Sequence, residues 1–362
     1  MLMCPTAVAA ALILSIASVQ ALAPPAPSVK LSNGMDMPML GLGTSDSGSM
    51  LVRGAVFEGI RSGYRYIDTA FIYGNHKSIG EGINDAIQAG IVRREDLFVS
   101  TKLWMSQYRP DVVRSSVEEM LQDLGLDYLD QLLMHWPVAF ERRDPQTHPF
   151  SWRIPRTASG RVAVDSSIRL IDTWREMEKL VDEGLVRSIG LSNFEPLQID
   201  EILAACRIRP VVNQIEVHPY LPQDRVIDFC TSRGIQVIGY APLGSPSSLP
   251  FAGETPKSSL EHPSVKAIAG KLGKTPAQVI LRWNLQRGII VIPKTIHRDR
   301  LLENLNVFDF QLSRLDMAQI DTIGQDPVDR VRIFNPDFYP RGKRVFTDVD
   351  ATELHQFVDF EL

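Results

Sequence analysis

Cysteine is scarce in this chain of 362 residues, and the three cysteines, Cys4, Cys206 and Cys230, follow no metal-binding spacing. An odd number at these separations indicates neither a disulfide framework nor a zinc site, and we expect no bound metal. Basic residues are also in no excess, because 38 Lys and Arg stand against 43 Asp and Glu. A protein that binds nucleic acid or an anionic membrane normally carries a positive patch, so the net charge of -5 disfavours both partners.

The N-terminus carries an apolar run, but it is too short for a membrane helix of ~20 residues. Ala7–Val19 spans 13 residues and is followed by Ala21-Leu22-Ala23 and then by prolines. We predict a leader over residues 1–23 and a proline-rich linker over residues 24–28, which sends the chain into the secretory pathway without stable membrane association after cleavage. No basic residue precedes the run and a proline follows the cleavage signal. A plastid route through a bipartite leader, a retained anchor, and a misassigned start with a cytoplasmic product therefore stay open.

From Val29 onward, short apolar runs alternate with amphipathic segments. Hydrophobic residues make up 44% of the chain, enough to bury a large core. The sequence predicts a small hairpin, Val29–Leu31 and Met35–Met37, around a turn at Asn33-Gly34. Strands are predicted at Met39–Leu42, Tyr66–Asp68, Leu97–Thr101, Tyr128–Met134, Val186–Leu191, Val211–Glu216, Gln236–Gly239 and Ile289–Ile292, and helices at Leu51–Ser62, Asp111–Leu124, Ile168–Glu183 and Pro276–Arg287.

Two α/β folds alternate strands and helices in this way. A doubly wound sheet that binds a dinucleotide normally has a glycine-rich turn after its first strand, and here Asp46 stands where the third glycine should be. We therefore predict a (β/α)8 TIM barrel over residues 29–330. A long loop, from Val138 to about Ser167, follows its fourth strand, and residues 331–362 form a C-terminal loop over the barrel mouth, with Phe334, Phe338 and Tyr339.

Catalytic groups of such barrels lie at the C-terminal ends of the strands, and every predicted strand ends in polar residues. In strand order these are Thr44; Asp68, with Tyr73 on its loop; Lys102; His135; Ser192 and Asn193; Gln214 and Glu216; Tyr240; and Lys294. Four of them supply what a proton donor to a carbonyl requires. We expect the charge of Lys102 to lower the pKa of the Tyr73 phenol, Asp68 to keep the amine charged, and a neutral His135 to orient the carbonyl.

Long spaced motifs give the chain a resemblance to the aldo-keto reductases from Val29 to the C-terminus. The segments that carry it are Gly63–Ala70, Leu132–Pro137, Ile189–Phe194 and Ile292–Thr295 with Arg300, Glu303 and Asn304. The resemblance implies NADPH-dependent reduction of aldehydes and some ketones by a monomeric or weakly associating barrel. It makes Asp68, Tyr73, Lys102 and His135 catalytic, and places Trp104 and Trp136 with His135 along the substrate pocket.

The same resemblance assigns the cofactor contacts. Ser192, Asn193 and Gln214 would bind the nicotinamide amide, Tyr240 would stack on the ring, and Thr44 would lie beside them. Leu243 and Ser245 would follow the pyrophosphate. Lys294, Thr295 and Arg300 would hold the 2′-phosphate, with Glu303 and Asn304 at the adenine. Two cations and a hydroxyl suit a phosphate better than a bare ribose hydroxyl, so NADPH is favoured over NADH.

The chain departs from the family pattern at three positions near the site. Ser45 stands where many relatives carry a tryptophan, which opens or polarises one wall of the pocket; His76 replaces an acid, and Ala241 replaces a serine or cysteine. The long loop is rich in arginine, and we favour a solvated surface over a site for a substrate carboxylate or phosphate. Charged residues of this loop include Arg142, Arg143, Asp144, Arg153, Arg156 and Arg161.

Three functions fit these residues. The favoured one is an NADPH-dependent carbonyl reductase whose substrates include small sugars or hydroxyaldehydes. The alternatives are a cofactor-binding regulatory barrel with little turnover, and an aldolase that uses Lys102 as a Schiff-base nucleophile.

Overall fold

The computed structural model of the protein describes residues 26–45, 47–144, 146–148, 152–245, 258–326 and 329–334. Asp46, the predicted leader, and the tail residues Phe338 and Tyr339 lie outside these ranges. None of the described helices is both long and apolar enough to cross a membrane.

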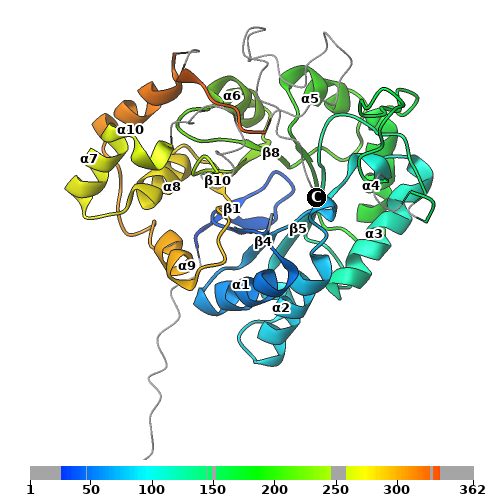
Figure 1. Ribbon diagram of the computed structural model, residues 1–362, viewed down its shortest axis with the longest axis horizontal. Helices are drawn as coiled ribbons and strands as arrows, with labels where there is room; N and C mark the ends of the chain where they lie inside the picture. The colour runs from blue at the N-terminus through cyan, green and yellow to red at the C-terminus, as the bar shows by residue number, and fades with distance from the viewer. Residues whose placement is uncertain are drawn as a thin grey trace, which may run out of the picture.

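Eight parallel strands form a barrel with helices around its outside, as predicted (Figure 1). In chain order they are β3 (Leu42–Gly43), β4 (Tyr66–Asp68), β5 (Phe98–Leu103), β6 (Gln131–Met134), β7 (Ile189–Ser192), β8 (Val212–Glu216), β9 (Gln236–Tyr240) and β10 (Ile290–Val291). Each strand pairs with its neighbour in sequence. Parallel bridges from Leu40 to Val291 and from Gly43 to Lys294 join the first strand to the last and close the barrel.

A helix follows each barrel strand and packs against the outer face of the sheet. These helices are α1 (Ser49–Ser62), α2 (His76–Gln88), α3 (Pro110–Leu124), α4 (Leu170–Asp182), α5 (Pro196–Leu203), α6 (Asp224–Ser232), α7 (Pro263–Leu272) with α8 (Pro276–Gln286), and α9 (Arg298–Leu305); α10 (Arg314–Asp321) comes after them. Turn chemistry sets several of their ends. The side chain of Thr275, for example, accepts a hydrogen bond from the backbone N–H of Gln278 and begins α8, while Gly125 ends α3 in the left-handed conformation with φ 63°.

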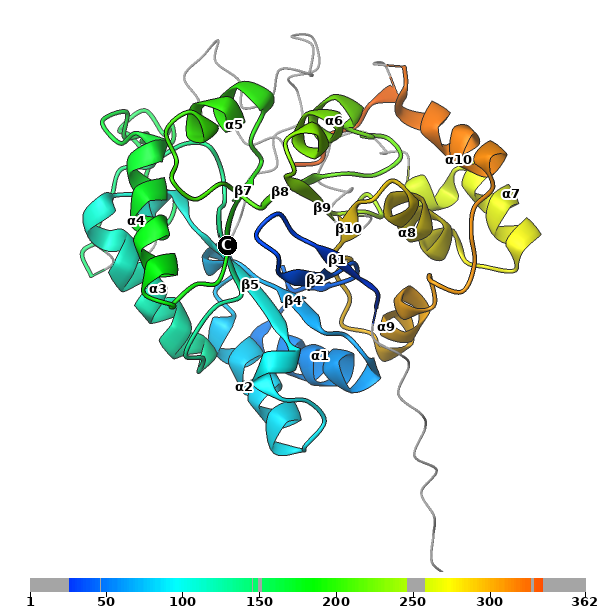
Figure 2. The same ribbon diagram turned by 180° about the vertical axis from the view of Figure 1, so that it is seen from behind.

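The N-terminal hairpin, β1 (Ser28–Lys30) and β2 (Asp36–Pro38), covers the end of the barrel where the strands begin (Figure 2). Leu31 and Met37 are buried against inward-facing strand residues such as Tyr66, Phe98 and Ile290. This end is therefore filled by apolar side chains, and the polar strand ends lie together at the opposite mouth.

Strand boundaries differ from the predicted ones by one to three residues. The third strand of the barrel, β5, runs on to Leu103, so Lys102 lies inside a strand rather than beyond it. Strand β6 begins at Gln131 rather than Tyr128, because the preceding Leu129 makes only an isolated bridge to Val186. Strand β7 includes Ser192, one residue past the predicted end. These shifts follow from register, which a single strand's apolar pattern does not contain.

Candidate active site

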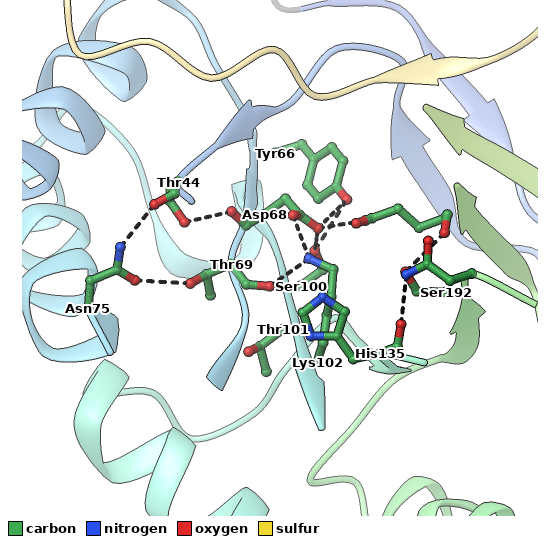
Figure 3. A network of polar contacts seen from close by, with 12 residues as sticks. Thr44, Tyr66, Asp68, Thr69, Asn75, Ser100, Thr101, Lys102, His135 and Ser192 are labelled. Atoms are coloured by element: carbon green, nitrogen blue, oxygen red, sulfur yellow. Dashed lines mark hydrogen bonds and ion pairs between the residues drawn. The ribbon is translucent and has the colours of Figure 1, made fainter. Parts of the chain in front are cut away.

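A buried carboxylate, Asp68 at the end of β4, organises the barrel mouth (Figure 3). Its Oδ1 accepts a hydrogen bond from the Lys102 ammonium at 2.7 Å. Its Oδ2 accepts from Ser100 Oγ at 2.8 Å, from Gln214 Nε2 at 2.8 Å and from Tyr66 Oη at 3.2 Å. These four donors lie on β4, β5 and β8 and together fix the orientation of the carboxylate. The side chains bonded to it are fixed in turn.

Lys102 lies beside Asp68 on the neighbouring strand, and only 1% of its side chain is exposed. Its ammonium also donates to the carbonyl of Thr69 at 2.9 Å, and lies 5.6 Å from the ring centroid of Tyr73. Burial lowers the pKa of Lys102, although the charge of Asp68 acts in the opposite direction. The cation therefore sits next to the phenol and is held there by a carboxylate, as the sequence predicted.

Tyr73 reaches this cation from a 3-10 turn, Phe71–Tyr73, which is ended by Gly74 in the left-handed conformation at φ 62°. Burial raises the pKa of its phenol, and the charge of Asp68 raises it further. The expectation that Lys102 lowers this pKa is wrong for the protein without ligands, since the ammonium faces Asp68 and Thr69 more closely than the phenol. The phenol consequently keeps its proton at neutral pH, which is the state a proton donor needs.

His135 follows β6 and completes the group. Its ring lies edge-on to Tyr73, with centroids 6.2 Å apart, and edge-on to Trp104 at 5.1 Å. Burial, with a smaller effect of the Lys102 charge, lowers the pKa of His135 well below its ordinary value, so the imidazole is neutral. Its Nδ1 is buried and has no hydrogen-bond partner among the described residues. A buried polar atom of this kind normally meets water or a ligand.

Two tryptophans flank this imidazole and make its surroundings apolar. Trp104 is edge-on to the His135 ring, and Trp136 is stacked at 6.5 Å. Both tryptophans are almost fully buried. Phe140 lies edge-on to Trp104 at 6.1 Å and extends the aromatic wall. The three rings form one aromatic wall beside His135, and the contact of both tryptophans with a substrate stays a prediction.

Residues at the ends of β7, β8 and β9 form the other side of the mouth. Asn193 donates to the His135 carbonyl at 2.9 Å and accepts from the Tyr240 hydroxyl at 2.9 Å. Its amide also donates to Ser192 Oγ at 3.2 Å, so all its polar atoms already have partners. The side-chain oxygen of Gln214 accepts no hydrogen bond within the described part of the chain, because only its nitrogen is used, on Asp68. The Ser192 hydroxyl likewise has partners, since it donates to the Gln214 carbonyl and accepts from Asn193, so of these three side chains only Gln214 has an oxygen that accepts no hydrogen bond in the described part of the chain.

The loops beyond these strand ends carry unusual backbone conformations. Asn193, Ala241 and Ser245 have φ of 63°, 45° and 38°, a region that residues other than glycine rarely adopt. Such strain tends to gather at functional sites. Leu243 lies between the last two and is partly buried against the core. The backbone of this loop is therefore held in a defined turn beside Tyr240.

The predicted phosphate and adenine residues lie in the connection after β10, which holds Lys294 and Thr295, and in α9, which holds Arg300, Glu303 and Asn304. Lys294 and Arg300 are exposed, whereas Thr295 is buried and its hydroxyl accepts from the backbone N–H of His297 at 3.1 Å. Glu303 accepts from the Thr275 hydroxyl, and Asn304 is buried and hydrogen-bonds Tyr64. Lys294 and Thr295 lie on the connection that leads into α9 and Arg300 lies in its first turn, and a helix N-terminus is a favourable place for an anion. Asn304 instead faces the core.

The long loop after β6 packs on the turn that carries Tyr73. Trp152 lies edge-on to Phe71 at 5.5 Å, and the guanidinium of Arg153 lies 5.7 Å from the same ring. The carbonyl of Arg153 accepts from Trp104 Nε1 at 2.6 Å. Arg142, Arg156 and Arg161 are exposed, in agreement with the surface interpretation of the loop's charge. Arg153 is the exception, since it is half-buried against aromatic rings.

Sequence reasoning missed several residues that support the site. His76 was noted as a departure from the family, and its Nε2 lies 2.9 Å from Thr101 Oγ1; burial lowers the pKa of His76 to about 4, and Lys102 and Arg153 act in the same direction. The other missed residues are Tyr66, Ser100, Thr69 and Asn75. They join Thr44, a residue that the sequence did single out, whose hydroxyl donates to the Asp68 carbonyl and whose own carbonyl accepts from Asn75. Tyr66 and Ser100 stand two residues before Asp68 and Lys102, so strand alternation places them on the same face and was the available signal. Within the described ranges, no three His, Cys, Asp or Glu side chains form a group suited to a metal.

Comparisons with known proteins agree on one family. The profile of the aldo/keto reductase family matches residues 50–325. Aldo-keto reductase family 1 member A1 of Rattus norvegicus is 44% identical over 335 residues, which cover 92% of this chain and 99% of that protein; the Homo sapiens protein is 43% identical over 91% and 98%. Among solved structures, the aldose reductase of Schistosoma japonicum has a TM-score of 0.77 at 41% identity, over 85% of this chain and 94% of that one. A Bombyx mori aldo-keto reductase in complex with NADP has a TM-score of 0.76 at 36% identity, over 86% and 95%.

Proposed function

Because the chain belongs to the aldo/keto reductase family, we propose that it reduces aldehydes and some ketones to alcohols with NADPH, using Tyr73 as the proton donor. Membership makes the protein an oxidoreductase of carbonyl and alcohol groups. One observation carries the finer proposal: a neutral phenol, a cation paired with a carboxylate, and a neutral imidazole meet at one barrel mouth. Each residue type is in the protonation state that carbonyl reduction requires.

The chain's own residues manage the proton. His135 and Tyr73 both hydrogen-bond the carbonyl oxygen and orient it. Tyr73 then transfers its phenolic proton to that oxygen as the C=O double bond becomes a single bond. The phenolate left behind is stabilised by Lys102, whose ammonium lies 5.6 Å from the ring and keeps its charge beside Asp68. The aromatic wall of Trp104, Trp136 and Phe140 excludes water from this transfer.

The other side of the mouth fits NADPH by its donor set. When bound, this cofactor supplies the hydride that adds to the carbonyl carbon. Ser192 and the open oxygen of Gln214 would hold the nicotinamide amide, and Tyr240 would support the ring. Thr44, Leu243 and Ser245 would border the nicotinamide and pyrophosphate. Lys294, Thr295 and Arg300 would bind the 2′-phosphate at the start of α9, and Glu303 would lie near the adenine.

We propose small polar carbonyl compounds, such as sugars or hydroxyaldehydes, as substrates. Ser45, at the first strand end, offers a small polar side chain where many relatives have a tryptophan, which leaves more room beside the aromatic wall. We also propose that the protein is active as a monomer. A panel of aldehydes, hydroxyaldehydes, sugars and ketones, each assayed with NADPH and with NADH, identifies the class; equal rates for apolar and hydroxylated aldehydes would contradict the role given to Ser45.

The decisive experiment compares two phenol deletions. Tyr73→Phe should lower kcat for an aldehyde by at least about a hundredfold, the usual contribution of a general acid, and leave the Kd for NADPH nearly unchanged. Tyr128→Phe is the matched control, because its phenol lies at the opposite end of the barrel between Arg94 and Arg187. Retention of most turnover by Tyr73→Phe would refute the assignment of the proton donor.

The two alternative functions have less support. A regulatory barrel with little turnover does not need the complete set of Asp68, Tyr73, Lys102 and His135. Measurable oxidation of NADPH in the presence of an aldehyde would exclude this function. An aldolase would need Lys102 as a free neutral amine, but this side chain is buried and bonded to Asp68 and Thr69. Borohydride trapping of a substrate on Lys102 would favour that chemistry instead.

A further inference from the structure

A second buried carboxylate, that of Glu216, lies at the mouth and takes no part in the proposed reaction. Glu216 ends β8 and is completely buried. Its Oε1 accepts from the backbone N–H of Ile333 at 2.8 Å and lies 2.9 Å from His218 Nε2, while its Oε2 accepts from the backbone N–H of Phe334 at 3.0 Å. Two of its three partners belong to the last described segment, residues 329–334.

These contacts keep the carboxylate charged. Burial alone would raise the pKa of Glu216, but the His218 hydrogen bond, the positive charge of Arg332 and the Ile333 N–H outweigh it, so the pKa is lowered. An ionised carboxylate accepts two backbone N–H groups more strongly than a neutral acid or amide does.

The same segment meets the cofactor side of the mouth. In the β8–β9 register Glu216 is the partner of Tyr240, and the Phe334 ring lies edge-on to the Tyr240 ring with centroids 5.5 Å apart. Tyr240 in turn donates its hydroxyl to Asn193. The segment runs from the end of α10 toward β8 (orange in Figures 1 and 2). Upstream, its contacts include Arg330 Nε donating to the Gly324 carbonyl, Val331 N–H donating to the Tyr220 carbonyl and Asp329 N–H donating to the Asp326 carbonyl.

We propose that Glu216 is a positioning residue that holds residues 329–334 on β8, places Phe334 against Tyr240, and so sets the affinity for the nicotinamide cofactor. The proposal rests on the proposed function only for the identity of that cofactor. Loss of the carboxylate would leave the upstream contacts intact and remove the two hydrogen bonds that join the backbone of Ile333 and Phe334 to β8. Tyr240 would then lose the ring that supports its position.

Glu216→Gln tests the attachment, with Glu178→Gln as a matched control. Glu178 is also a buried carboxylate that accepts two successive backbone N–H groups, those of Arg207 at 2.6 Å and Ile208 at 2.8 Å, but it lies on α4 outside the barrel. Tryptic cleavage after Arg332, followed by mass spectrometry without cofactor, should be at least about tenfold faster in Glu216→Gln than in the wild type or in Glu178→Gln, the effect of about 1.4 kcal/mol. Equal rates in the two variants overturn the attachment.

Cofactor affinity tests the link to Tyr240. Glu216→Gln and Phe334→Ala should each weaken NADPH binding severalfold, measured by tryptophan fluorescence quenching, while Phe334→Ala keeps the backbone bonds and the wild-type cleavage rate. Unchanged affinity in both variants overturns the link. Because coupling is reciprocal, bound NADPH should also slow cleavage after Arg332 in the wild type. This measurement needs no variant, so it can be made even if Glu216→Gln does not fold. An unchanged cleavage rate at saturating NADPH would count against the proposal. Failure of wild-type protein to bind NADPH would instead refute the proposed function, and the cofactor-free cleavage comparison would stand.

Discussion

Replacement of Asp68 by Asn should destabilise the protein strongly. The Lys102–Asp68 pair is 2.7 Å long, and its side chains are 1% and 3% exposed, so water cannot screen the ammonium once the carboxylate is gone. Removal of one member of a buried pair costs about 3–5 kcal/mol, because an uncompensated charge remains. The asparagine would also place its NH2 group against a side chain that now donates a hydrogen bond to Asp68, such as Ser100 or Gln214, so that bond is lost. We expect a loss in the upper part of that range.

A double-mutant cycle separates the pair from its surroundings. Lys102→Met removes the cation and should also cost about 3–5 kcal/mol, whereas Asp68→Asn with Lys102→Met removes both charges and should cost little more than either single change. The coupling energy should therefore exceed about 2 kcal/mol. Asp36→Asn is the control, since Lys30 and Asp36 are 67% and 66% exposed and such a pair contributes about 1 kcal/mol or less.

Urea unfolding measures these free energies. Tryptophan fluorescence and circular dichroism are followed together, because coincident curves justify a two-state treatment. If the double variant loses the sum of the two single losses to within about 0.5 kcal/mol, the two side chains do not interact and the account of the Asp68 site is wrong.

Two further predictions concern the cofactor and pH. Lys294→Ala should raise the KM for NADPH about ten- to a hundredfold, because a hydrogen bond to a charged group contributes ~1.5–3 kcal/mol. The preference of the enzyme for NADPH over NADH should become smaller. If steady-state kinetics give the same ratio of kcat/KM for the two cofactors as in the wild type, Lys294 does not contact the 2′-phosphate. His76 has a folded pKa of about 4 and an unfolded pKa near ~6.5, so stability is full above the unfolded value and falls as pH decreases toward the folded one. The wild type should therefore lose about 2 kcal/mol more unfolding free energy than His76→Gln when the pH is lowered from ~7 to ~5. Urea unfolding of both proteins at both pH values measures these losses, and equal losses in the two proteins would contradict the prediction.

The sequence predicted the barrel and the group at its mouth because both depend on local signals. Apolar runs gave the strands, and a strand that ends in Asp68 or is followed by His135 reports its own orientation. Parallel strands then bring these ends to one edge, whatever their exact bounds. For this reason the shifts in β5 and β7 moved Lys102 and Ser192 along their strands without moving them away from the site.

Other features could not be predicted from the sequence because they depend on distant contacts. The bonds of the Asn193 side chain to the Tyr240 hydroxyl and the His135 carbonyl depend on other strands and could not be predicted, and its contact with the cofactor stays a prediction. The pKa of Tyr73 was predicted in the wrong direction, since burial cannot be judged from the residue types alone. The role of Glu216 required knowing that residues more than a hundred positions later return to β8.

The position of Asp68 links the two halves of the proposed reaction. One oxygen binds the ammonium of Lys102, beside the proposed proton donor, and the other binds the amide nitrogen of Gln214, which we propose as a nicotinamide contact. A carboxylate that rotates to follow one partner must leave the other, because both bonds are short and the group is rigid. The placement of the hydride donor and of the proton donor is therefore fixed by the same side chain, and a change at Asp68 should disturb both cofactor affinity and proton transfer rather than either one alone.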